Sequence, residues 1–373
     1  MAASGSADFS FQVDPWVHFL GGLVERRPGL WTRLGNFETR LLEAELADVV
    51  VKAPIYVAGM ARSGSTLLLE LLEWHTQTGS HRYRDFPMLY TPHLWNRFLD
   101  RVPLRRQAPA ERAHQDGIFV SAESPEAFEE VLWMAFFPGL HDPMRSAVLD
   151  AHTENPAFEA FYRDHLRKLL LVRGAQRYLS KANYNLTRLE YLLKLFPDAR
   201  FVIPVRDPAW HIASLMKQHR LFCRGQQDNP RALIHLRRAG HFEFGLDRRP
   251  INVGDAAIAD IQTAWRNGAE VEGWALYWNQ VHGWLSDRLE RNAALRAASL
   301  IVPYDALCKH PDRLLPEIFA HGRLEAPPAL LARARERIRF PEYYRPGFEP
   351  EESSLIAQVT AATAARLGLQ DAC

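Results

Sequence analysis

The fold of this chain is decided by residues 59–66, which read Gly59-Met60-Ala61-Arg62-Ser63-Gly64-Ser65-Thr66. An apolar run at 54–58 precedes them and predicts a short buried strand, and a leucine-rich run at 67–73 predicts a helix. The spacing G-x-x-x-x-G-x-T lets backbone N–H groups hold a phosphate at a helix N-terminus. A nucleoside triphosphatase has lysine where this chain has Ser65, and the loop's only cation is Arg62. The loop therefore predicts phosphate binding, but not ATP binding.

Composition narrows the class of protein. The 373 residues are 47% hydrophobic and 24% charged, with a net charge of +1, which is ordinary for a globular protein and gives no basic footprint for nucleic acid. Three scattered cysteines argue against a disulfide framework or a zinc site and favour a reducing compartment. Residues 1–11 lack the pattern of a signal peptide, and no apolar run approaches the roughly 20 residues that span a bilayer. We expect a cytoplasmic protein without a membrane span.

Further strands are expected after the loop, alternating with helices. The strands are predicted at 177–181, 199–205 and 299–302, and the helices at 125–137, 156–172, 186–196 and 265–289. This alternation predicts an α/β fold of the P-loop type, with a central parallel sheet between two layers of helices. We expect one domain over 1–373, with a helical arm at 12–50 and an Arg-rich excursion at 220–262 that forms a lid or a solvated loop. Ligands of such sheets bind beyond the carboxyl ends of the strands.

A second motif follows the strand at 199–205. It reads Arg206-Asp207-Pro208, with Ser214 eight residues after the arginine. Together with the loop at 61–66, this motif resembles the sulfotransferase family, in particular its bacterial and tyrosylprotein branch. The approach to the strand at 196–201 and the segment 302–307, which contains Tyr304, resemble the same family more weakly.

The resemblance implies a donor, 3′-phosphoadenosine 5′-phosphosulfate, and the residues that bind it. The loop and Arg62 would hold the 5′-phosphosulfate, and Arg206 with Ser214 the 3′-phosphate. Lys181 resembles a basic residue near the donor in related enzymes, although a surface salt bridge is nearly as good an explanation. No metal is implied. The implied donor-binding residues are Arg62, Ser63, Gly64, Ser65, Thr66, Arg206, Ser214 and Tyr304.

Transfer of a sulfuryl group needs charge neutralisation on the leaving oxygen and a base for the acceptor proton. Arg62 is the candidate for the first role. The family's tyrosylprotein branch has a carboxylate about twenty residues after the loop arginine, and Asp85 is the nearest match and the first candidate for the base. Flanking arginines would lower its pKa, so a structural ion pair is the alternative. The alternative bases are His81 and His75, although a single histidine is more often structural. Glu123 and Glu126 are expected to face the acceptor, with a charge at a helix N-terminus as the alternative for Glu126.

The acceptor is less determined by the sequence. We expect a hydroxyl or amine on a small molecule, lipid or peptide, in a pocket formed by aromatic residues or, alternatively, with those residues in the core: Phe86, Trp95, Trp133, Phe136 and Phe137. The rival functions are a P-loop kinase and a nucleotide-binding module without activity. The oligomeric state is not predicted.

Overall fold

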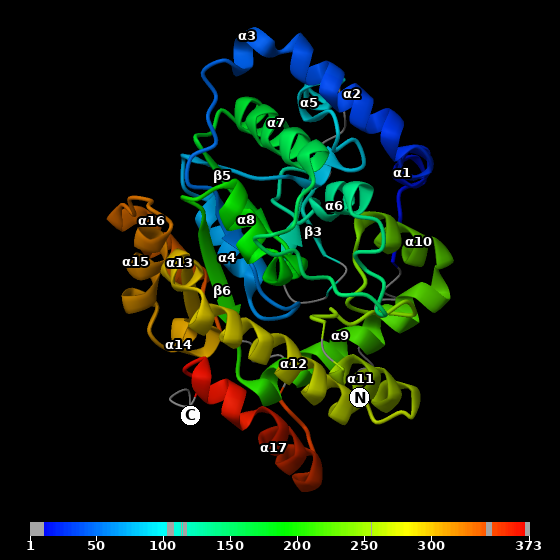
Figure 1. Cartoon of the computed structure of the whole chain (residues 1–373), viewed down its shortest axis with the longest axis vertical. Coiled ribbons are helices and arrows are strands. Elements are labelled where there is room, and N and C mark those ends of the chain that lie inside the picture. The colour runs from blue at the N-terminus through cyan, green and yellow to red at the C-terminus, as the bar shows by residue number, and fades with distance from the viewer. Residues whose placement is uncertain are drawn as a thin grey trace, which may run out of the picture.

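The protein is described from a computed structural model, which covers residues 11–102, 108–112, 114, 118–254, 256–340 and 345–369. Its centre is a parallel sheet of five strands in the order β2-β5-β1-β6-β7 (Figure 1). The strands are β1 (Ile55–Val57), β2 (Thr78–Gly79), β5 (Arg177–Lys181), β6 (Arg200–Val205) and β7 (Ser299–Pro303). The four strands expected from the sequence are present. The very short β2 at the sheet edge was not expected.

Successive residues of each strand point to opposite faces of the sheet, so the sheet has two cores. On one face, Tyr56, Tyr178 and Phe201 pack with apolar residues of α7 (Pro156–Arg173), α8 (Leu189–Leu195), α9 (Pro208–Asp228) and α12 (Glu270–Arg291). On the other face, Ile55 and Val57 pack with α4 (Ser65–Glu73), α14 (Tyr304–Lys309), α15 (Pro311–His321) and α16 (Pro328–Arg337). The predicted α/β architecture with helices on both faces is confirmed.

The expected arm at 12–50 is helical and consists of α1 (Pro15–Arg26), α2 (Pro28–Leu41) and α3 (Glu43–Leu46). Helix α2 lies along α7, where Lys168 Nζ forms a buried ion pair with Glu38 at 2.9 Å (Figure 1). Helix α1 meets α10 (Pro230–Ala239) through Arg238, whose Nε lies 2.7 Å from Glu25 Oε2. The arm therefore supports α10, which precedes part of the site described below.

Segment 220–262 differs from the expected lid or solvated loop. It contains the end of α9, then α10 and most of α11 (Ala257–Arg266), and it packs against the rest of the chain. Arg248 pairs with Glu270 at 2.7 and 2.9 Å, and its guanidinium carbon lies 3.9 Å from the Trp265 ring centroid. Because Arg248 is paired with residues of α11 and α12, the segment is packed into the fold and is not a solvated loop.

Two helices begin later than expected, for local reasons. The helix predicted at 265–289 is divided at Gly268, whose φ of 76° belongs to the left-handed region, so α11 ends there and α12 begins at Glu270. The helix predicted from 125 is α6 (Glu130–Phe136), because Pro125 instead forms a bridge with Arg82. The remaining elements are α5 (Pro92–Arg101), α13 (Ala293–Ala298), α17 (Pro350–Arg366), the 3-10 turns η1 (Tyr83–Asp85) and η2 (Asn183–Thr187), and a ribbon of β3 (Ala110–Glu111) and β4 (Phe119–Val120).

No helix in the described ranges has the length and apolar character needed to cross a membrane.

Candidate active site

The phosphate loop joins β1 to α4 by a tight backbone turn. Arg62 has a φ of 70° and Gly64 a φ of 102°, both in the left-handed region. A Cβ on Gly64 would lie 2.3 Å from Cδ2 of Tyr304, so only glycine fits there. Ser63 Oγ is buried and has no hydrogen-bond partner among the described residues. The curled backbone at the N-terminus of α4 is therefore a cradle of the kind that binds anions.

The second motif lies at the end of the neighbouring strand, β6. Asp207 caps α9 by accepting a hydrogen bond from the Trp210 backbone N–H at 3.1 Å, and Pro208 begins the helix. This places Arg206 at the carboxyl edge of the sheet, where it is 3% exposed. Within the second turn of α9, Ser214 Oγ accepts a hydrogen bond from Arg62 Nε at 3.2 Å. The two motifs, 152 residues apart in the chain, are in direct contact.

Strand β7, which runs parallel to β6, also ends at the carboxyl edge of the sheet. Tyr304, which begins α14, covers Gly64 of the loop, and its ring centroid lies 5.3 Å from the guanidinium carbon of Arg206. Asp305 Oδ2 accepts a hydrogen bond from the Asp207 N–H at 3.2 Å. Burial raises the pKa of Asp305 above its usual value. The structure thus brings Arg62, Arg206, Ser214 and Tyr304 together at one edge of the sheet.

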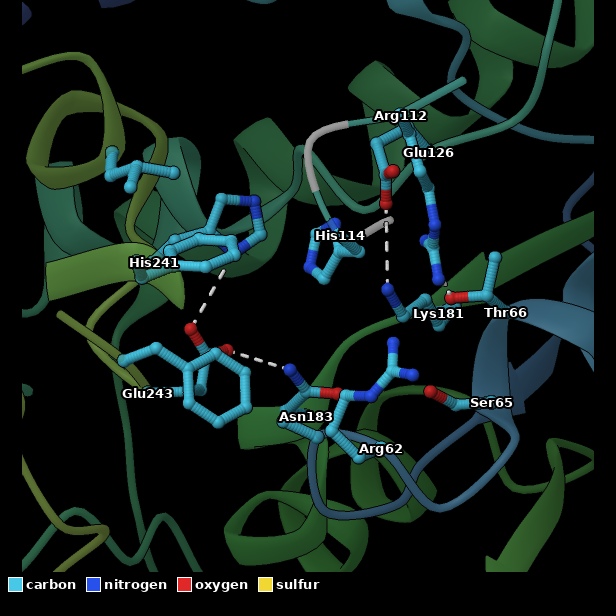
Figure 2. Close-up of a pocket in the computed structure, with 14 residues that line it drawn as sticks. Arg62, Ser65, Thr66, Arg112, His114, Glu126, Lys181, Asn183, His241 and Glu243 are labelled. Carbon is cyan, nitrogen blue, oxygen red and sulfur yellow. Dashed lines mark hydrogen bonds and ion pairs between the residues drawn. The ribbon is translucent and has the colours of Figure 1, made fainter. Parts of the chain in front are cut away.

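A small cavity of about 60 Å³ lies beside the phosphate loop (Figure 2). Charged and polar side chains from distant segments face it, together with an apolar wall. The lining residues are Ala61, Arg62, Ser65, Thr66, Arg112, His114, Glu126, Lys181, Asn183, Phe222, Leu236, His241, Glu243 and Phe244.

Lys181 and Glu126 form an ion pair across this cavity, with Nζ 3.4 Å from Oε1. Glu126 also accepts hydrogen bonds from the Tyr83 hydroxyl at 2.6 Å and from the Ala127 N–H at 2.7 Å. Burial by itself would raise the pKa of Glu126, but the charges of Lys181 and Arg112 and these hydrogen bonds outweigh it and hold the pKa well below its usual range. Glu126 is therefore a fixed anion and a poor proton acceptor.

A second set of polar side chains, Asn183, His241 and Glu243, lines the cavity on the side opposite Lys181 and Glu126 (Figure 2). His241 Nδ1 lies 3.6 Å from Glu243 Oε2, and Asn183 Nδ2 donates to Glu243 Oε1 at 2.6 Å (Figure 2). Burial lowers the pKa of His241, but the hydrogen bond and charge of Glu243 raise it by more, so the net shift is upward. Burial would raise the pKa of Glu243, but His241 and Asn183 lower it overall.

The first sequence candidate for the base, Asp85, does not face this cavity. It is 1% exposed and ion-paired with Arg173, and it accepts hydrogen bonds from Asn96 Nδ2 at 2.9 Å and the Arg82 N–H at 2.8 Å. Burial would raise its pKa, but His81 and Arg173 lower it well below its usual range. This is the structural ion pair that the sequence left open, so the geometry argues against Asp85 as the base.

Of the other sequence candidates, Glu126 lines the cavity, whereas His81, His75 and Glu123 have partners elsewhere. His81 is buried and stacks on His165, with 3.1 Å between their Nε2 atoms. His75 Nε2 contacts the Glu325 carbonyl oxygen at 2.8 Å, and Glu123 pairs with Arg82 and Arg84. None of the latter three candidates lines the cavity.

The five aromatic residues considered either for an acceptor pocket or for the core are not among those that line the cavity. Trp133, Phe136 and Phe137 pack with Phe158 in the core, Phe86 stacks on Phe128, and Trp95 stacks on Phe98. The aromatic wall is instead Phe222 and Phe244, with ring centroids 5.6 Å apart. Sequence reasoning also missed Arg112, His114, Asn183, His241 and Glu243, because no local motif marks them.

Comparison with known proteins explains the two motifs. The sequence profile of the sulfotransferase family matches residues 54–244, just over half of the chain. The chain belongs to this family. The resemblance predicted from the loop and from Arg206 is confirmed. The matched region begins at β1 and ends directly after His241 and Glu243, so it contains the cavity residues described above but not Tyr304.

Two solved structures of sulfotransferases are similar to this one. Sulfotransferase STF1 from Mycobacterium tuberculosis H37Rv is 16% identical over 93% of this chain and 86% of that chain, with a TM-score of 0.46. Sulfotransferase STF9 from Mycobacterium avium is 17% identical over 88% of this chain and 80% of that chain, with a TM-score of 0.49. No curated protein sequence matches this chain.

Proposed function

We propose that the protein transfers a sulfuryl group from 3′-phosphoadenosine 5′-phosphosulfate to a hydroxyl or amine, with the whole chain acting as one domain. The observation that carries this proposal is the hydrogen bond between Arg62 of the phosphate loop and Ser214 of the second motif, at 3.2 Å. This donor carries two separate anionic groups on one adenosine. Two adjacent cationic sites are what its recognition requires.

The residues at the sheet edge fit the donor by their chemistry. The loop amides and the hydroxyls of Ser63, Ser65 and Thr66 would hold the 5′-phosphosulfate, and the buried Ser63 Oγ is a hydroxyl for which the described residues supply no partner. Arg206 and Ser214 would hold the 3′-phosphate, and Tyr304, which packs against both the loop and Arg206, would contact the adenine.

Two cations of the cavity would assist the reaction. Arg62 and Lys181 both line the cavity, and Lys181 is anchored by Glu126 at 3.4 Å. The donor supplies an activated sulfuryl group, whose departure leaves negative charge on the bridging oxygen of the 5′-phosphate. We assign Arg62, helped by Lys181, the stabilisation of that charge. The narrow cavity with Phe222 and Phe244 would admit only the reacting end of the acceptor.

The rival function, a P-loop kinase or an inactive nucleotide-binding module, is not favoured, because the family is one of sulfotransferases and Ser65 replaces the lysine of ATP-binding loops. Isothermal titration calorimetry distinguishes a sulfotransferase from a P-loop kinase. We expect the protein to bind adenosine 3′,5′-bisphosphate without Mg²⁺ and at least ten-fold more tightly than ADP. Failure to bind the bisphosphate, or Mg²⁺-dependent ATP turnover, would refute the proposal.

The acceptor can be sought with the donor labelled on its sulfur. Incubation of the protein with panels of phenols, alcohols, sugars, lipids and amines should transfer the label to one chemical class. The protein with Arg62→Ala serves as the matched control, because it removes the cation of the loop and should show no transfer.

A further inference from the structure

Three side chains from two separate segments form a row at the cavity, joined by one hydrogen bond and one ion-pair contact. Asn183 follows β5 in η2, whereas His241 and Glu243 follow α10. Asn183 Nδ2 donates to one oxygen of Glu243 at 2.6 Å, and the other oxygen of Glu243 lies 3.6 Å from His241 Nδ1. All three line the cavity that also contains Arg62 and Lys181 (Figure 2).

We propose that His241 is the base that takes the acceptor's proton, and that Glu243 and Asn183 are positioning residues that fix its ring. The inference rests on the sulfotransferase function proposed above. With Nδ1 directed to Glu243, the ring nitrogen that remains for the acceptor is Nε2. A carboxylate on Nδ1 selects this tautomer and stabilises the imidazolium that forms when the proton arrives.

The end of helix α10 determines where the His241 side chain begins. Helix α10 ends at Gly240 with a φ of 77°, and the His241 N–H donates to the Leu236 carbonyl at 2.9 Å, which closes the helix end. A Cβ at position 240 would lie 2.4 Å from Glu130 Cγ, so no other residue fits. The direction in which His241 leaves the helix is therefore fixed by the fold.

The other ionisable groups of the cavity are less suited to this role. Glu126 is held as an anion by Lys181, and Lys181 and the arginines are cations that cannot accept a proton. His114 packs its ring against Phe222 at 5.1 Å between centroids. The charged and titratable groups around His241 are Glu243 from its own segment, His235 of α10, Glu126, Lys181, Arg62, Arg112 and His114.

The step balances as a displacement at sulfur. The acceptor oxygen or nitrogen forms a bond to sulfur while the bond from sulfur to the bridging 5′-phosphate oxygen breaks, and the acceptor's proton moves to His241 Nε2. The electron pair of the broken bond stays on the phosphate oxygen of the departing adenosine 3′,5′-bisphosphate, next to Arg62. Afterwards His241 returns its proton to water.

The proposal predicts a specific pH dependence. His241 must be neutral to accept a proton, so turnover rises with pH through the pKa of His241, which Glu243 holds above the ordinary value of 6.5 although burial opposes it. Removal of the Glu243 charge by Glu243→Gln should lower that pKa, so the acidic limb of the rate profile moves to lower pH.

The first test is an NMR titration of protein labelled with ¹³C at histidine Cε1, in which His241→Gln identifies the His241 signal. We expect His241 to titrate above 6.5 and Glu243→Gln to lower its pKa, whereas Glu351→Gln, on the exposed side of α17, leaves it unchanged. A His241 pKa that is below 6.5, or that does not respond to Glu243→Gln, would overturn the proposed pairing.

The second test is the rate of transfer from the labelled donor to 2-naphthol as a probe, or to water if 2-naphthol is not turned over. We expect His241→Gln to lower kcat by about 10²- to 10⁴-fold and to abolish the acidic limb, while the affinity for adenosine 3′,5′-bisphosphate changes less than about three-fold. A decrease of less than about five-fold, or an acidic limb that persists, would refute His241 as the base. If the unmodified protein does not bind adenosine 3′,5′-bisphosphate, the proposed function itself is refuted.

Discussion

Replacement of Arg206 by alanine tests the most specific part of the donor site, because only the 3′-phosphate separates this donor from ordinary adenine nucleotides. Arg206 is 3% exposed, and its guanidinium carbon lies 5.3 Å from the Tyr304 ring centroid and 6.0 Å from that of Trp210. A buried, pre-positioned guanidinium loses little side-chain entropy when it binds a phosphate.

The expected magnitude follows from the hydrogen bonds that Arg206 can make. A hydrogen bond to a charged group contributes about 1.5–3 kcal/mol, and a guanidinium can direct two of them at one phosphate. Two bonds at the lower limit amount to about 3 kcal/mol, which is roughly a 150-fold increase in the Kd of adenosine 3′,5′-bisphosphate. Adenosine 5′-monophosphate lacks the 3′-phosphate, so its Kd should change less than about three-fold.

Isothermal titration calorimetry with both nucleotides measures this difference directly. Arg200→Ala is the matched control, since Arg200 begins the same strand, β6, at the end away from the loop, and it should leave both affinities unchanged. Thermal unfolding of each variant shows whether it remains folded. Equal losses of affinity for the two nucleotides would refute the assignment of Arg206 to the 3′-phosphate.

Three further predictions concern the loop and the buried charges. Gly64→Ala should weaken bisphosphate binding at least ten-fold in calorimetry, since a left-handed alanine costs about 1–2 kcal/mol and its Cβ collides with the Tyr304 ring. The double variant Gly64→Ala, Tyr304→Ala lacks that collision, so it should unfold at a higher temperature than Gly64→Ala alone. Arg188→Ala should lower the free energy of unfolding by about 3–5 kcal/mol in urea titrations, because it leaves the buried Glu130 carboxylate, now bound at 2.7 and 2.8 Å, without its guanidinium. Asp85→Asn should also destabilise the protein, with bisphosphate affinity changed less than about two-fold by calorimetry.

The ion pair of Arg188 and Glu130 also makes stability depend on pH. Burial would raise the pKa of Glu130, but Arg188 and His141 lower it overall, to about 2 in the folded protein against an ordinary value of 4.5. The pair's contribution is therefore fully present above pH 4.5 and is lost as the pH falls towards 2. In Arg188→Ala this acid-dependent loss should shrink, and an unchanged acid profile would contradict the assignment.

Sequence reasoning reached the sheet because its signals are local. The apolar runs at 54–58, 177–181, 199–205 and 299–302 each read as a buried strand without reference to any other segment, and all became strands. Sequence reasoning misplaced elements where the backbone turns without a proline or another strong sequence signal. Gly268 divides a helix whose apolar pattern runs on, and the Arg-rich segment at 220–262 is polar in composition yet packs through Arg248 on Trp265.

Asp85, the first candidate for the base, illustrates the same limit of local sequence patterns. Asp85 has a favourable offset from the loop, but offset along the sequence does not determine burial, and the fold places Arg173, 88 residues away, directly against it.

The sequence by itself determined the family, the parallel sheet and the positions of the two motifs, because backbone turns and strand periodicity depend on residues that are neighbours in the chain. Only the tertiary structure decided which charges meet. Arg62 reaches Ser214 across 152 residues, and Glu243 reaches Asn183 across 60. The pKa of a carboxyl or an imidazole depends on burial and on charges within a few ångströms, and those neighbours exist only after the strands have assembled.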